Sequence, residues 1–226
     1  MIDDTVLLVP AFNEGAVIGQ YLSSARQRFR WIVCVDDGST DDTAQQAQDA
    51  GAIVLRHPVN LGQGAAIQTA IEYAQRLPVQ WFCTFDADGQ HRLEDVETMR
   101  HLAMTTDVDI ILGSRFLGDA TGMPLLRRWF LKAAVWFANL TSGVKLTDAH
   151  NGLRLFNRHV AQTIDLQEPG FNHASEFVEK IKANHYTYTE APVTIDYSNY
   201  SKAKGQSMLN AVNIATDTLT AKVMNR

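Results

Sequence analysis

The chain has 226 residues, of which 46% are hydrophobic and 20% are charged, and its formal net charge is -5. This composition is ordinary for a globular protein with a substantial core, and the negative charge argues against nucleic acid as a partner. Cys34 and Cys83 lie in apolar runs and are expected to pack in the core, which fits a reducing cytosol. The N-terminal residues lack a signal-peptide pattern, and no apolar run approaches the roughly 20 residues that span a bilayer. We therefore expect a cytoplasmic protein, either free or attached peripherally to the inner face of the membrane.

Short apolar runs alternate with segments of helical periodicity from residue 5 to residue 112. The predicted strands are Thr5–Val9, Trp31–Val35, Ala52–Leu55, Trp81–Phe85 and Val108–Leu112, and the predicted helices lie near 14–28, 41–50, 63–76 and 91–104. This alternation predicts an α/β fold with a mainly parallel central sheet flanked by helices. Ligands of such sheets bind beyond the carboxyl ends of the strands, which is where the polar clusters of this chain lie.

The first predicted strand leads into a turn that contains Pro10, Phe12, Asn13 and Glu14. Pro10 restricts the turn, Phe12 offers a ring that can stack on a base, and Glu14 stands where a helix begins. Taken alone, this segment is only a strand-to-helix turn.

The second predicted strand ends in two adjacent carboxylates, Asp36 and Asp37. Asp41 or Thr40 suffices to cap the helix that follows, so Asp36 and Asp37 exceed what capping requires. A carboxylate at a strand end is suited to hydrogen bonds with a ribose or a base edge. Further along the chain, Gly64 and its neighbours allow close backbone approach of a phosphate or sugar, although a lone Gly-x-Gly is weak evidence.

The fourth predicted strand runs directly into Asp86-Ala87-Asp88, the most informative stretch of the chain. Residues i and i+2 of a strand point to the same side, so Asp86 and Asp88 can direct their oxygens at one point. Oxygen ligands of this kind suit Mg²⁺ or Mn²⁺. The alternative is a simple turn, since Asp-Gly is common after strands.

Beyond residue 112 the pattern changes. The segment from Met123 to Lys145 mixes large apolar side chains with basic ones, and it fits equally an interfacial membrane segment or a core helix with a basic rim. The segment from Ser207 to Arg226 has apolar residues at helical spacing and predicts an amphipathic helix that docks on the domain, a second subunit or a membrane. We therefore divide the chain into a domain at 1–206 and a C-terminal helix at 207–226.

These motifs, taken in order, resemble the family 2 inverting glycosyltransferases with a GT-A nucleotide-diphospho-sugar transferase fold. The matching segments are Val9–Glu14, Val35–Asp41, Asn60–Ala66, Phe85–His91, Gly113–Arg115 and Asn151–Phe156. The resemblance covers about residues 5 to 207 and is strongest to dolichyl- and polyprenyl-phosphate sugar transferases, whose Asp-x-Asp-x-Gln pattern is matched by Asp86, Asp88 and Gln90. It implies that these three residues hold Mg²⁺ or Mn²⁺ on the donor diphosphate.

The resemblance also implies roles for other residues. Arg115 and Arg154 would stabilise the charge of the leaving diphosphate, and Asp148 would be the acceptor-side carboxylate, with Glu176 as the competing base. The nucleotide-sugar site would comprise Pro10, Phe12, Asn13, Glu14, Asp36, Asp37, Gly64, Asp86, Ala87 and Lys202.

Two departures from the family pattern concern the acceptor and the last loop. His150-Asn151 and Leu153 replace the usual Thr-Ser and Phe, so the acceptor pocket is expected to differ. Tyr197 replaces an expected cation, which Lys202 or Lys204 would supply from a mobile loop.

The leading hypothesis is metal-dependent transfer of a sugar from a UDP- or GDP-sugar to a polyprenyl or dolichyl phosphate at the membrane surface. One alternative is transfer to a soluble or lipid-linked saccharide in cell-envelope polysaccharide synthesis, and another is a non-catalytic nucleotide-sugar binding module. A nucleotidyltransferase is disfavoured because the chain lacks a Gly-rich, Lys-bearing N-terminal loop. A second copy of the chain and a separate membrane protein both remain open as partners.

Overall fold

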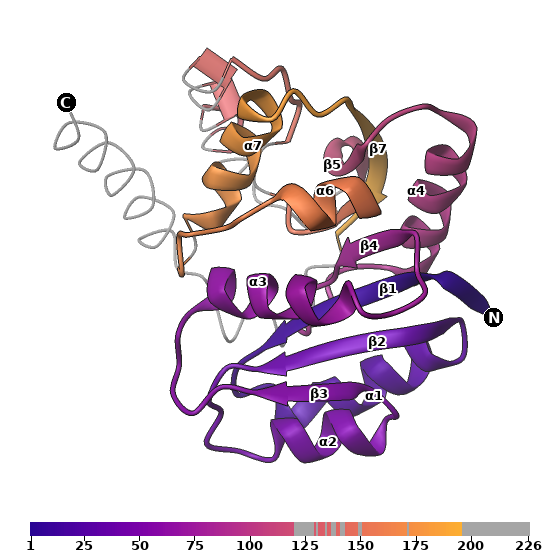
Figure 1. Cartoon of the computed structure of the whole chain (residues 1–226), viewed down its shortest axis with the longest axis vertical. Coiled ribbons are helices and arrows are strands. Elements are labelled where there is room, and N and C mark those ends of the chain that lie inside the picture. The colour runs from indigo at the N-terminus through magenta and orange to yellow at the C-terminus, as the bar shows by residue number, and fades with distance from the viewer. Residues whose placement is uncertain are drawn as a thin grey trace, which may run out of the picture.

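The computed structural model describes residues 1–119, 129, 131–133, 135–136, 139–140, 143–148, 151–170 and 172–195. Their strands form a seven-stranded sheet in the order β3-β2-β1-β4-β6-β5-β7 (Figure 1). The strands are β1 (Ile2–Ala11), β2 (Phe29–Asp36), β3 (Ile53–Arg56), β4 (Trp81–Thr84), β5 (Ile110–Asp119), β6 (Arg154–Asn157) and β7 (Tyr188–Thr194). The helices are α1 (Gly15–Arg26), α2 (Thr43–Asp49), α3 (Gln63–Ala74), α4 (Leu93–Thr105), α6 (Arg158–Thr163) and α7 (His173–Ala183).

The first half of the sheet agrees with the prediction. Strands β3, β2, β1 and β4 are parallel neighbours, and the helices between them fall where the periodicity placed them. Strand β5 is also parallel to its neighbour β7. The predicted α/β fold with a mainly parallel sheet is confirmed.

Strand β6 is the exception, because it runs antiparallel to both β4 and β5. Its first residue, Arg154, pairs with Thr84 on β4 and Leu112 on β5. A reversed strand begins at the edge where its neighbours end, so Arg154 enters the sheet beside the carboxyl end of β4. The sequence did not predict this reversal.

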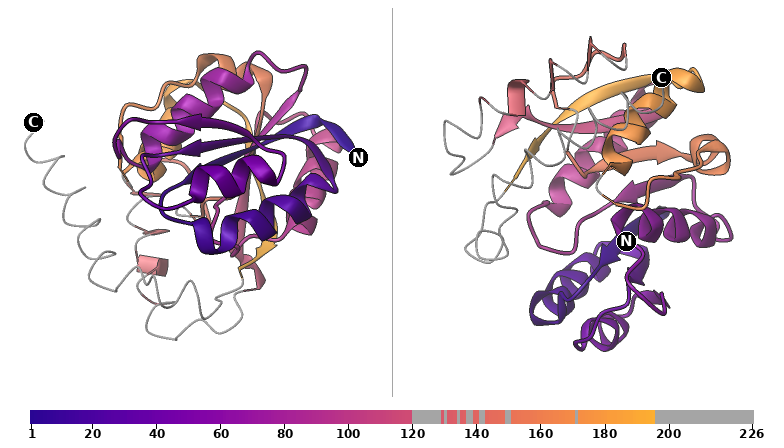
Figure 2. Two further views of the ribbon diagram at one scale, coloured as in Figure 1. Left: turned by 90° about the horizontal axis from the view of Figure 1, so that it is seen from below. Right: turned by 90° about the vertical axis from the view of Figure 1, so that its left-hand side faces the viewer.

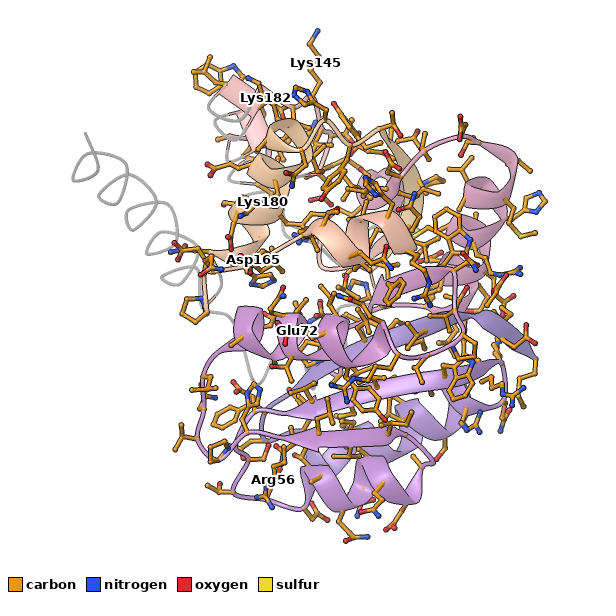
Figure 3. All side chains as sticks on the ribbon, in the orientation of Figure 1. Arg56, Glu72, Lys145, Asp165, Lys180 and Lys182 are labelled. Carbon is orange, nitrogen blue, oxygen red and sulfur yellow. The ribbon has the colours of Figure 1, made fainter. Side chains whose placement is uncertain are left out.

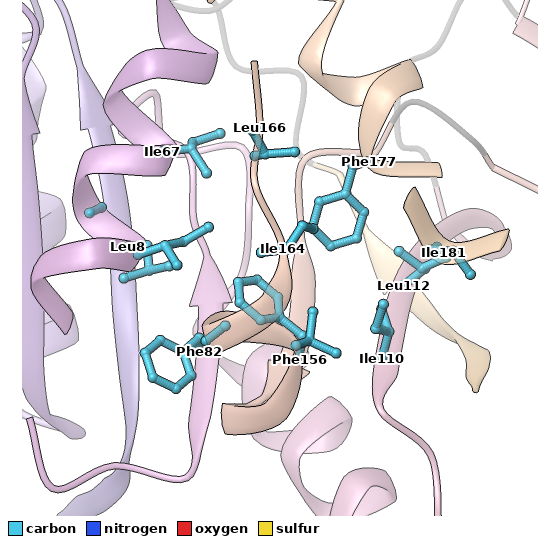
Figure 4. Close-up of a cluster of buried hydrophobic side chains, with 14 of the residues drawn as sticks. Leu8, Ile67, Phe82, Ile110, Leu112, Phe156, Ile164, Leu166, Phe177 and Ile181 are labelled. Atoms are coloured by element: carbon cyan, nitrogen blue, oxygen red, sulfur yellow. The ribbon is translucent and has the colours of Figure 1, made fainter. Parts of the chain in front are cut away.

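Helices cover both faces of the sheet, as the two further views show (Figure 2). One hydrophobic cluster joins a face of the sheet to α3, α6 and α7, and Figure 4 shows its centre, where the rings of Phe82 and Phe156 stack at 5.9 Å. A second cluster joins the opposite face to α1, α2 and α4. Buried strands between two helical layers explain why the strand runs are apolar throughout.

Both cysteines are buried in the second cluster, as predicted. Cys34 on β2 and Cys83 on β4 are free thiols with no exposed surface. Burial raises the pKa of Cys34 to about 12 and raises that of Cys83 as well, so both remain protonated.

Several predictions concern residues outside the described part of the chain. These are the helix at 207–226, the domain boundary before it, the loop cations Lys202 and Lys204, and most of the segment from 123 to 145. Among the described residues, no helix is both long and apolar enough to traverse a bilayer.

Candidate functional site

The polar clusters predicted from the strand ends meet at one edge of the sheet. Ala11 at the end of β1 pairs with Asp36 at the end of β2, and Asp37 N donates to Ala11 O at 2.8 Å. The loop after β4, beginning with Phe85, leaves the sheet beside β1, because Phe85 N donates to Leu8 O at 2.9 Å. We call the ends of β1, β2 and β4 the donor side, and residues 143–195 with β5 the acceptor side.

The turn after β1 is fastened to the loop after β2. Asn13, at φ 53°, donates its backbone N–H to Ser39 Oγ at 2.9 Å and accepts from Thr40 N through Oδ1 at 2.9 Å. Glu14 N donates to Thr43 Oγ1 at 2.8 Å. Asn13 therefore shapes the loops, while the ring of Phe12 remains exposed at the surface.

Pro10 is buried at the end of β1, where the predicted turn begins. The donor side also contains an open pocket of about 500 Å³ next to the end of β2. Its lining residues are Gly38, Ser39, Thr40, Arg56, His57 and Pro58.

Asp36 is fully buried beside this pocket. Its Oδ1 accepts from Ser39 N at 2.9 Å. Arg56 Nε lies 3.1 Å from Oδ2, but Oδ2 has no aligned hydrogen-bond donor among the described residues. The Arg56 side chain is 59% exposed and projects to the surface at the end of β3 (Figure 3). A buried carboxylate oxygen without a hydrogen bond is costly, which makes Oδ2 a candidate ligand contact.

Asp37 has a different position. Its Oδ1 accepts from Leu61 N at 2.9 Å and lies 2.7 Å from His57 Nδ1, and its Oδ2 accepts from Gly62 N at 2.8 Å. His57 Nε2 lies 3.0 Å from Thr69 Oγ1 on α3. Asp37 thus organises the loop that leads into α3, and its oxygens already have partners within the protein.

Gly64 does permit close backbone approach, but the approaching backbone belongs to the chain itself. Gly64 N and Ala65 N both donate to Pro169 O, at 2.7 and 3.3 Å. A Cβ at Gly64 would lie 2.0 Å from Glu168 O. The first turn of α3, which we predicted to receive a phosphate or sugar, therefore receives residues 168–169, a long-range contact that no local pattern indicates.

The loop after β4 carries Asp86 and Asp88, and each carboxylate has its own hydrogen-bond partners. Asp86 Oδ1 accepts from Gln63 Nε2 at 3.1 Å, and its Oδ2 accepts from His91 Nε2 at 3.0 Å. Asp88 accepts from the backbone and side-chain nitrogens of Gln90 at 3.1 and 2.6 Å. Ala87 between them is buried, so the two carboxylates rather than this side chain face the site.

The charges at this loop act on each other. Burial would raise the pKa of Asp86, but the hydrogen bond and charge of His91, with Arg154, hold it below its usual value. Burial, followed by the negative charge of Asp86, raises the pKa of Asp88 to about 6. A cation between two carboxylates that repel each other would be stabilised there.

The donor atoms fit a hard cation that is only partly enclosed by protein. Asp86 and Asp88 supply carboxylate oxygens with remaining lone pairs, and Gln90 supplies an amide oxygen. The described residues contain no group of three or more His, Cys, Asp or Glu side chains able to hold a metal ion. The set therefore suits Mg²⁺ or Mn²⁺ whose remaining ligands come from water and a diphosphate.

Arg154 connects the two sides of the site. Its guanidinium lies 4.5 Å from the centre of the Phe177 ring and donates through Nε to Asn151 O at 3.3 Å. Burial lowers the pKa of Arg154 to about 10, opposed by the charges of Asp86 and Asp148, so it remains a cation at pH 7. Arg154 thus supplies a buried positive charge on which both carboxylates act. Its role in stabilising a leaving anion stays a prediction.

Gly152 and His173 also border this region, and neither was predicted to have a role. A Cβ at Gly152 would lie 2.5 Å from Asp86 Oδ2. His173 donates from Nδ1 to Gly170 O at 2.8 Å, and burial with the charge of Arg154 lowers its pKa to about 4. His173 is therefore a neutral imidazole at pH 7. Only the position of Gly152, two residues before Arg154, could have drawn attention to it from sequence.

The acceptor-side carboxylate Asp148 forms a buried ion pair with Arg115. Asp148 Oδ2 accepts from Arg115 N at 3.1 Å and from Arg115 Nε at 2.6 Å. The structure thus brings together two residues predicted independently. Arg115 orients Asp148 in this arrangement, which is a different contact from the predicted one with a leaving diphosphate.

Glu176 makes contacts typical of a structural residue. Its carboxylate accepts from Gln167 N at 2.9 and 3.0 Å and from Glu168 N at 2.9 Å. Lys180 Nζ lies 3.8 Å away. Glu176 therefore holds the loop that covers the start of α3, and between the two predicted bases this geometry favours Asp148.

Comparison with known proteins identifies the family. The model for glycosyl transferase family 2 matches residues 6–165, which contain β1 from Val6 onward and all of β2 to β6. The chain belongs to glycosyl transferase family 2. A Methanocaldococcus jannaschii protein is 33% identical over 98% of this chain and 93% of its own length. The UDP-N-acetylglucosamine–dolichyl-phosphate N-acetylglucosaminyltransferase of Methanococcus voltae is 26% identical over 90% of each chain.

Solved structures agree on the fold of this family 2 glycosyltransferase. Glucosyl-3-phosphoglycerate synthase from Mycobacterium tuberculosis, in complex with Mn²⁺, uridine diphosphate and glucosyl-3-phosphoglycerate, superposes with a TM-score of 0.70 at 16% identity. The match covers 87% of this chain and 72% of that one. The GT-A fold and the glycosyltransferase activity expected from the motifs are confirmed, and the individual site residues stay predictions.

Proposed function

We propose that the protein transfers a sugar, with inversion, from a uridine-diphosphate sugar to the phosphate of a polyprenol at a membrane surface. The observation that carries this proposal is geometric: Arg154 pairs with Thr84 at the end of β4 and with Leu112 on β5, and a Cβ at Gly152 would lie 2.5 Å from Asp86 Oδ2. The charges of Asp86 and Asp148 both act on Arg154 there, and Asp86 acts on Asp88. The names of relatives that use dolichyl or polyprenyl phosphates support the acceptor.

The donor diphosphate would lie at the loop after β4. Asp86, Asp88 and Gln90 would hold Mg²⁺ or Mn²⁺, which supplies positive charge to the departing diphosphate when bound. Arg154 adds a fixed positive charge in a buried setting, where charges act more strongly than in water.

Asp36 favours uridine over guanosine as the base. Uracil presents a single ring N–H between two carbonyls, whereas guanine presents two adjacent N–H groups that suit two carboxylate oxygens. Asp36 Oδ1 is engaged by Ser39 N, which leaves Oδ2 for one N–H. The exposed Arg56 side chain would move from beside Oδ2 to admit the base.

Asp148 would act on the acceptor side. A polyprenyl phosphate is already anionic and nucleophilic, so a carboxylate there orients the acceptor, whereas a hydroxyl acceptor needs it as a base. Arg115, paired with Asp148, balances its charge and holds its direction.

Exposed apolar and basic side chains support a membrane-bound acceptor. Trp129, Trp136 and Leu140, from a helical stretch, are 75%, 67% and 68% exposed. Lys145 and Lys182 lie at the same end of the molecule (Figure 3), and Lys182 Nζ approaches Gly143. Aromatic and basic side chains together suit an anionic bilayer surface, so we propose peripheral attachment at the inner face.

Calorimetric titration tests the donor first. UDP-glucose, UDP-N-acetylglucosamine and GDP-mannose are each titrated with and without Mn²⁺, and the sugar nucleotide that binds is then offered with polyprenyl phosphate. We expect Mn²⁺-dependent binding of a uridine donor and transfer to the lipid. Selective binding of GDP-mannose would contradict uridine as the donor base. Donor binding without transfer to the lipid would contradict the lipid-phosphate acceptor and favour a saccharide acceptor.

A flotation experiment tests the surface independently. The protein is mixed with vesicles of neutral lipid or with vesicles that contain anionic lipid, and the bound fraction is measured. We expect binding to anionic vesicles that Trp136→Ala weakens severalfold, whereas absence of binding would contradict the peripheral attachment.

A further inference from the structure

Asp148 lies in a segment, 143–148, that belongs to no strand, so other parts of the protein must hold it. The main contact comes from Glu190 on β7. Its carboxylate accepts from Thr147 N at 2.9 Å through each oxygen, from Thr147 Oγ1 at 2.9 Å and from Asp148 N at 3.2 Å. One side chain thus binds two successive backbone N–H groups, those of Thr147 and Asp148.

The neighbouring strand β5 completes this attachment. Leu112 on β5 pairs with Glu190 on β7, so the two strands are adjacent at this point. Ser114 Oγ lies 2.6 Å from Thr147 Oγ1, and Arg115 binds the Asp148 carboxylate. The backbone of Asp148 is therefore held from β7, and its side chain is held from β5.

The chemistry of these contacts requires a carboxylate at position 190. All the groups that face Glu190 from residues 147 and 148 are donors, namely two backbone N–H groups and one hydroxyl. A carboxylate is acceptor-only, whereas the amide of glutamine would turn an NH₂ group toward one of these donors. Asp148 is buried whereas Thr147 is exposed, so the Asp148 N–H is the donor whose lost partner water replaces least readily.

We propose that Glu190 is a positioning residue for the transfer reaction, acting through the backbone of Asp148 rather than on either substrate. This inference rests on the proposed acceptor-side role of Asp148. A displacement of about 1 Å at a reacting group can lower a rate about 100-fold. Loss of Glu190 should therefore lower kcat while leaving donor binding intact.

Asp109 provides a matched control at the other end of the same pair of strands. Its Oδ2 accepts from Thr187 N at 2.9 Å and Thr187 Oγ1 at 2.8 Å, so it also holds a threonine through its amide and hydroxyl. Asp109 precedes β5 and Thr187 precedes β7, at the edge of the sheet opposite the site. Asp109→Asn removes an equivalent contact without touching Asp148.

The test compares Glu190→Gln with Asp109→Asn in the full chain. We expect Glu190→Gln to lower kcat about 10–100-fold with Mn²⁺-dependent donor binding unchanged, and Asp109→Asn to retain kcat. A double-mutant cycle with Asp148→Asn should show that Glu190→Gln has no further effect once the Asp148 carboxylate is gone. Equal losses of kcat in the two single variants, or independent effects in the cycle, would overturn the proposal.

Amide hydrogen exchange tests the contact between Glu190 and residues 147–148 without any acceptor substrate. The amides of Thr147 and Asp148 should exchange faster in Glu190→Gln than in the wild type, and Asp109→Asn should leave them unchanged. Unchanged exchange at 147–148 in Glu190→Gln would overturn the anchoring itself. If the enzyme proves to use a saccharide rather than a lipid phosphate, the same kcat comparison is made with that acceptor, so failure of the acceptor assignment is distinguishable from failure of this inference.

Discussion

The donor and acceptor sides of the site are held together over different distances in the chain. On the donor side, Asp36 is bound by an amide three residues later, and Asp88 is bound by Gln90, two residues later. On the acceptor side, Asp148 is bound by Arg115 and Glu190, which are 33 and 42 residues away. Asp37 and Asp86 are bound by Gly62 and Gln63, 25 and 23 residues away. The donor side is thus shaped by contacts within and between its own loops, whereas the acceptor side depends on the pairing of β5 with β7. Variants on the two sides should consequently fail in different ways.

The strongest test of the donor side is Asp86→Ala. Removing this carboxylate takes away one oxygen ligand and one of the negative charges that face His91 and Arg154. We expect transfer to fall by at least about 1,000-fold and Mn²⁺-dependent donor binding to disappear. Asp49→Ala, an exposed carboxylate on α2, is the control. Retained turnover in Asp86→Ala would remove the metal assignment.

The corresponding test of the acceptor side is Asp148→Asn. The amide keeps the size of the side chain but loses its charge beside Arg115. We expect kcat to fall about 100–1,000-fold while donor affinity stays within about twofold of the wild type. Loss of donor binding as well would mean that the two sides are not separable, contrary to the comparison.

A methyl group added at position 152 tests whether this residue, from the acceptor-side segment, contacts the donor-side carboxylate Asp86. In Gly152→Ala the new Cβ would lie 2.5 Å from Asp86 Oδ2, so the carboxylate must move. We expect donor affinity in the presence of Mn²⁺ to fall about tenfold, equivalent to about 1.4 kcal/mol. Gly170→Ala is the matched control, because nothing lies within 4 Å of its added Cβ. An equal effect of both substitutions would contradict a steric cause.

The pH dependence of metal binding tests the charges on the donor side. The pKa of Asp88 is raised to about 6, so this carboxyl is largely protonated at pH 5 and ionised at pH 7. A cation must displace that proton, so its affinity should rise up to about tenfold per pH unit below 6 and level off above. Titration calorimetry with Mn²⁺ between pH 5 and 8 measures this rise, and a flat profile below pH 6 would show that Asp88 titrates normally or does not bind the metal.

The smallest expected effect on kcat is that of Glu176→Gln. This variant tests whether Glu176 stabilises the fold or takes part in the reaction. Glu176 accepts from the backbone amides of Gln167 and Glu168, and glutamine would leave one donor poorly paired. We expect a loss of about 1–3 kcal/mol in unfolding free energy, seen as a melting temperature several degrees lower, with kcat within about threefold of the wild type. A loss of kcat comparable to that of Asp148→Asn would make Glu176 the catalytic base.

The same contrast in distance explains what could be predicted from sequence. The strands and helices up to β5 follow from local periodicity, and Asp36, Asp86 and Asp88 follow from the rule that strand ends carry the site. The reversal of β6 could not be predicted, because four residues show no direction and their partners β4 and β5 lie far along the chain. The contact of Gly64 with Pro169 escaped prediction for the same reason. Glu176 and Gln167 are only nine residues apart, but one lies on a helix and the other in a loop whose placement no local pattern indicates.

The burial of both cysteines has a practical consequence for experiments at the membrane. Cys34 and Cys83 are the chain's only thiols, and both are shielded from water and protonated. Thiol reagents react with exposed thiolates, so the natural protein should remain unlabelled. A single Leu140→Cys substitution, at a position that is 68% exposed, would therefore accept one fluorophore without prior removal of native cysteines. Its emission would test directly whether the surface around Leu140 contacts a bilayer.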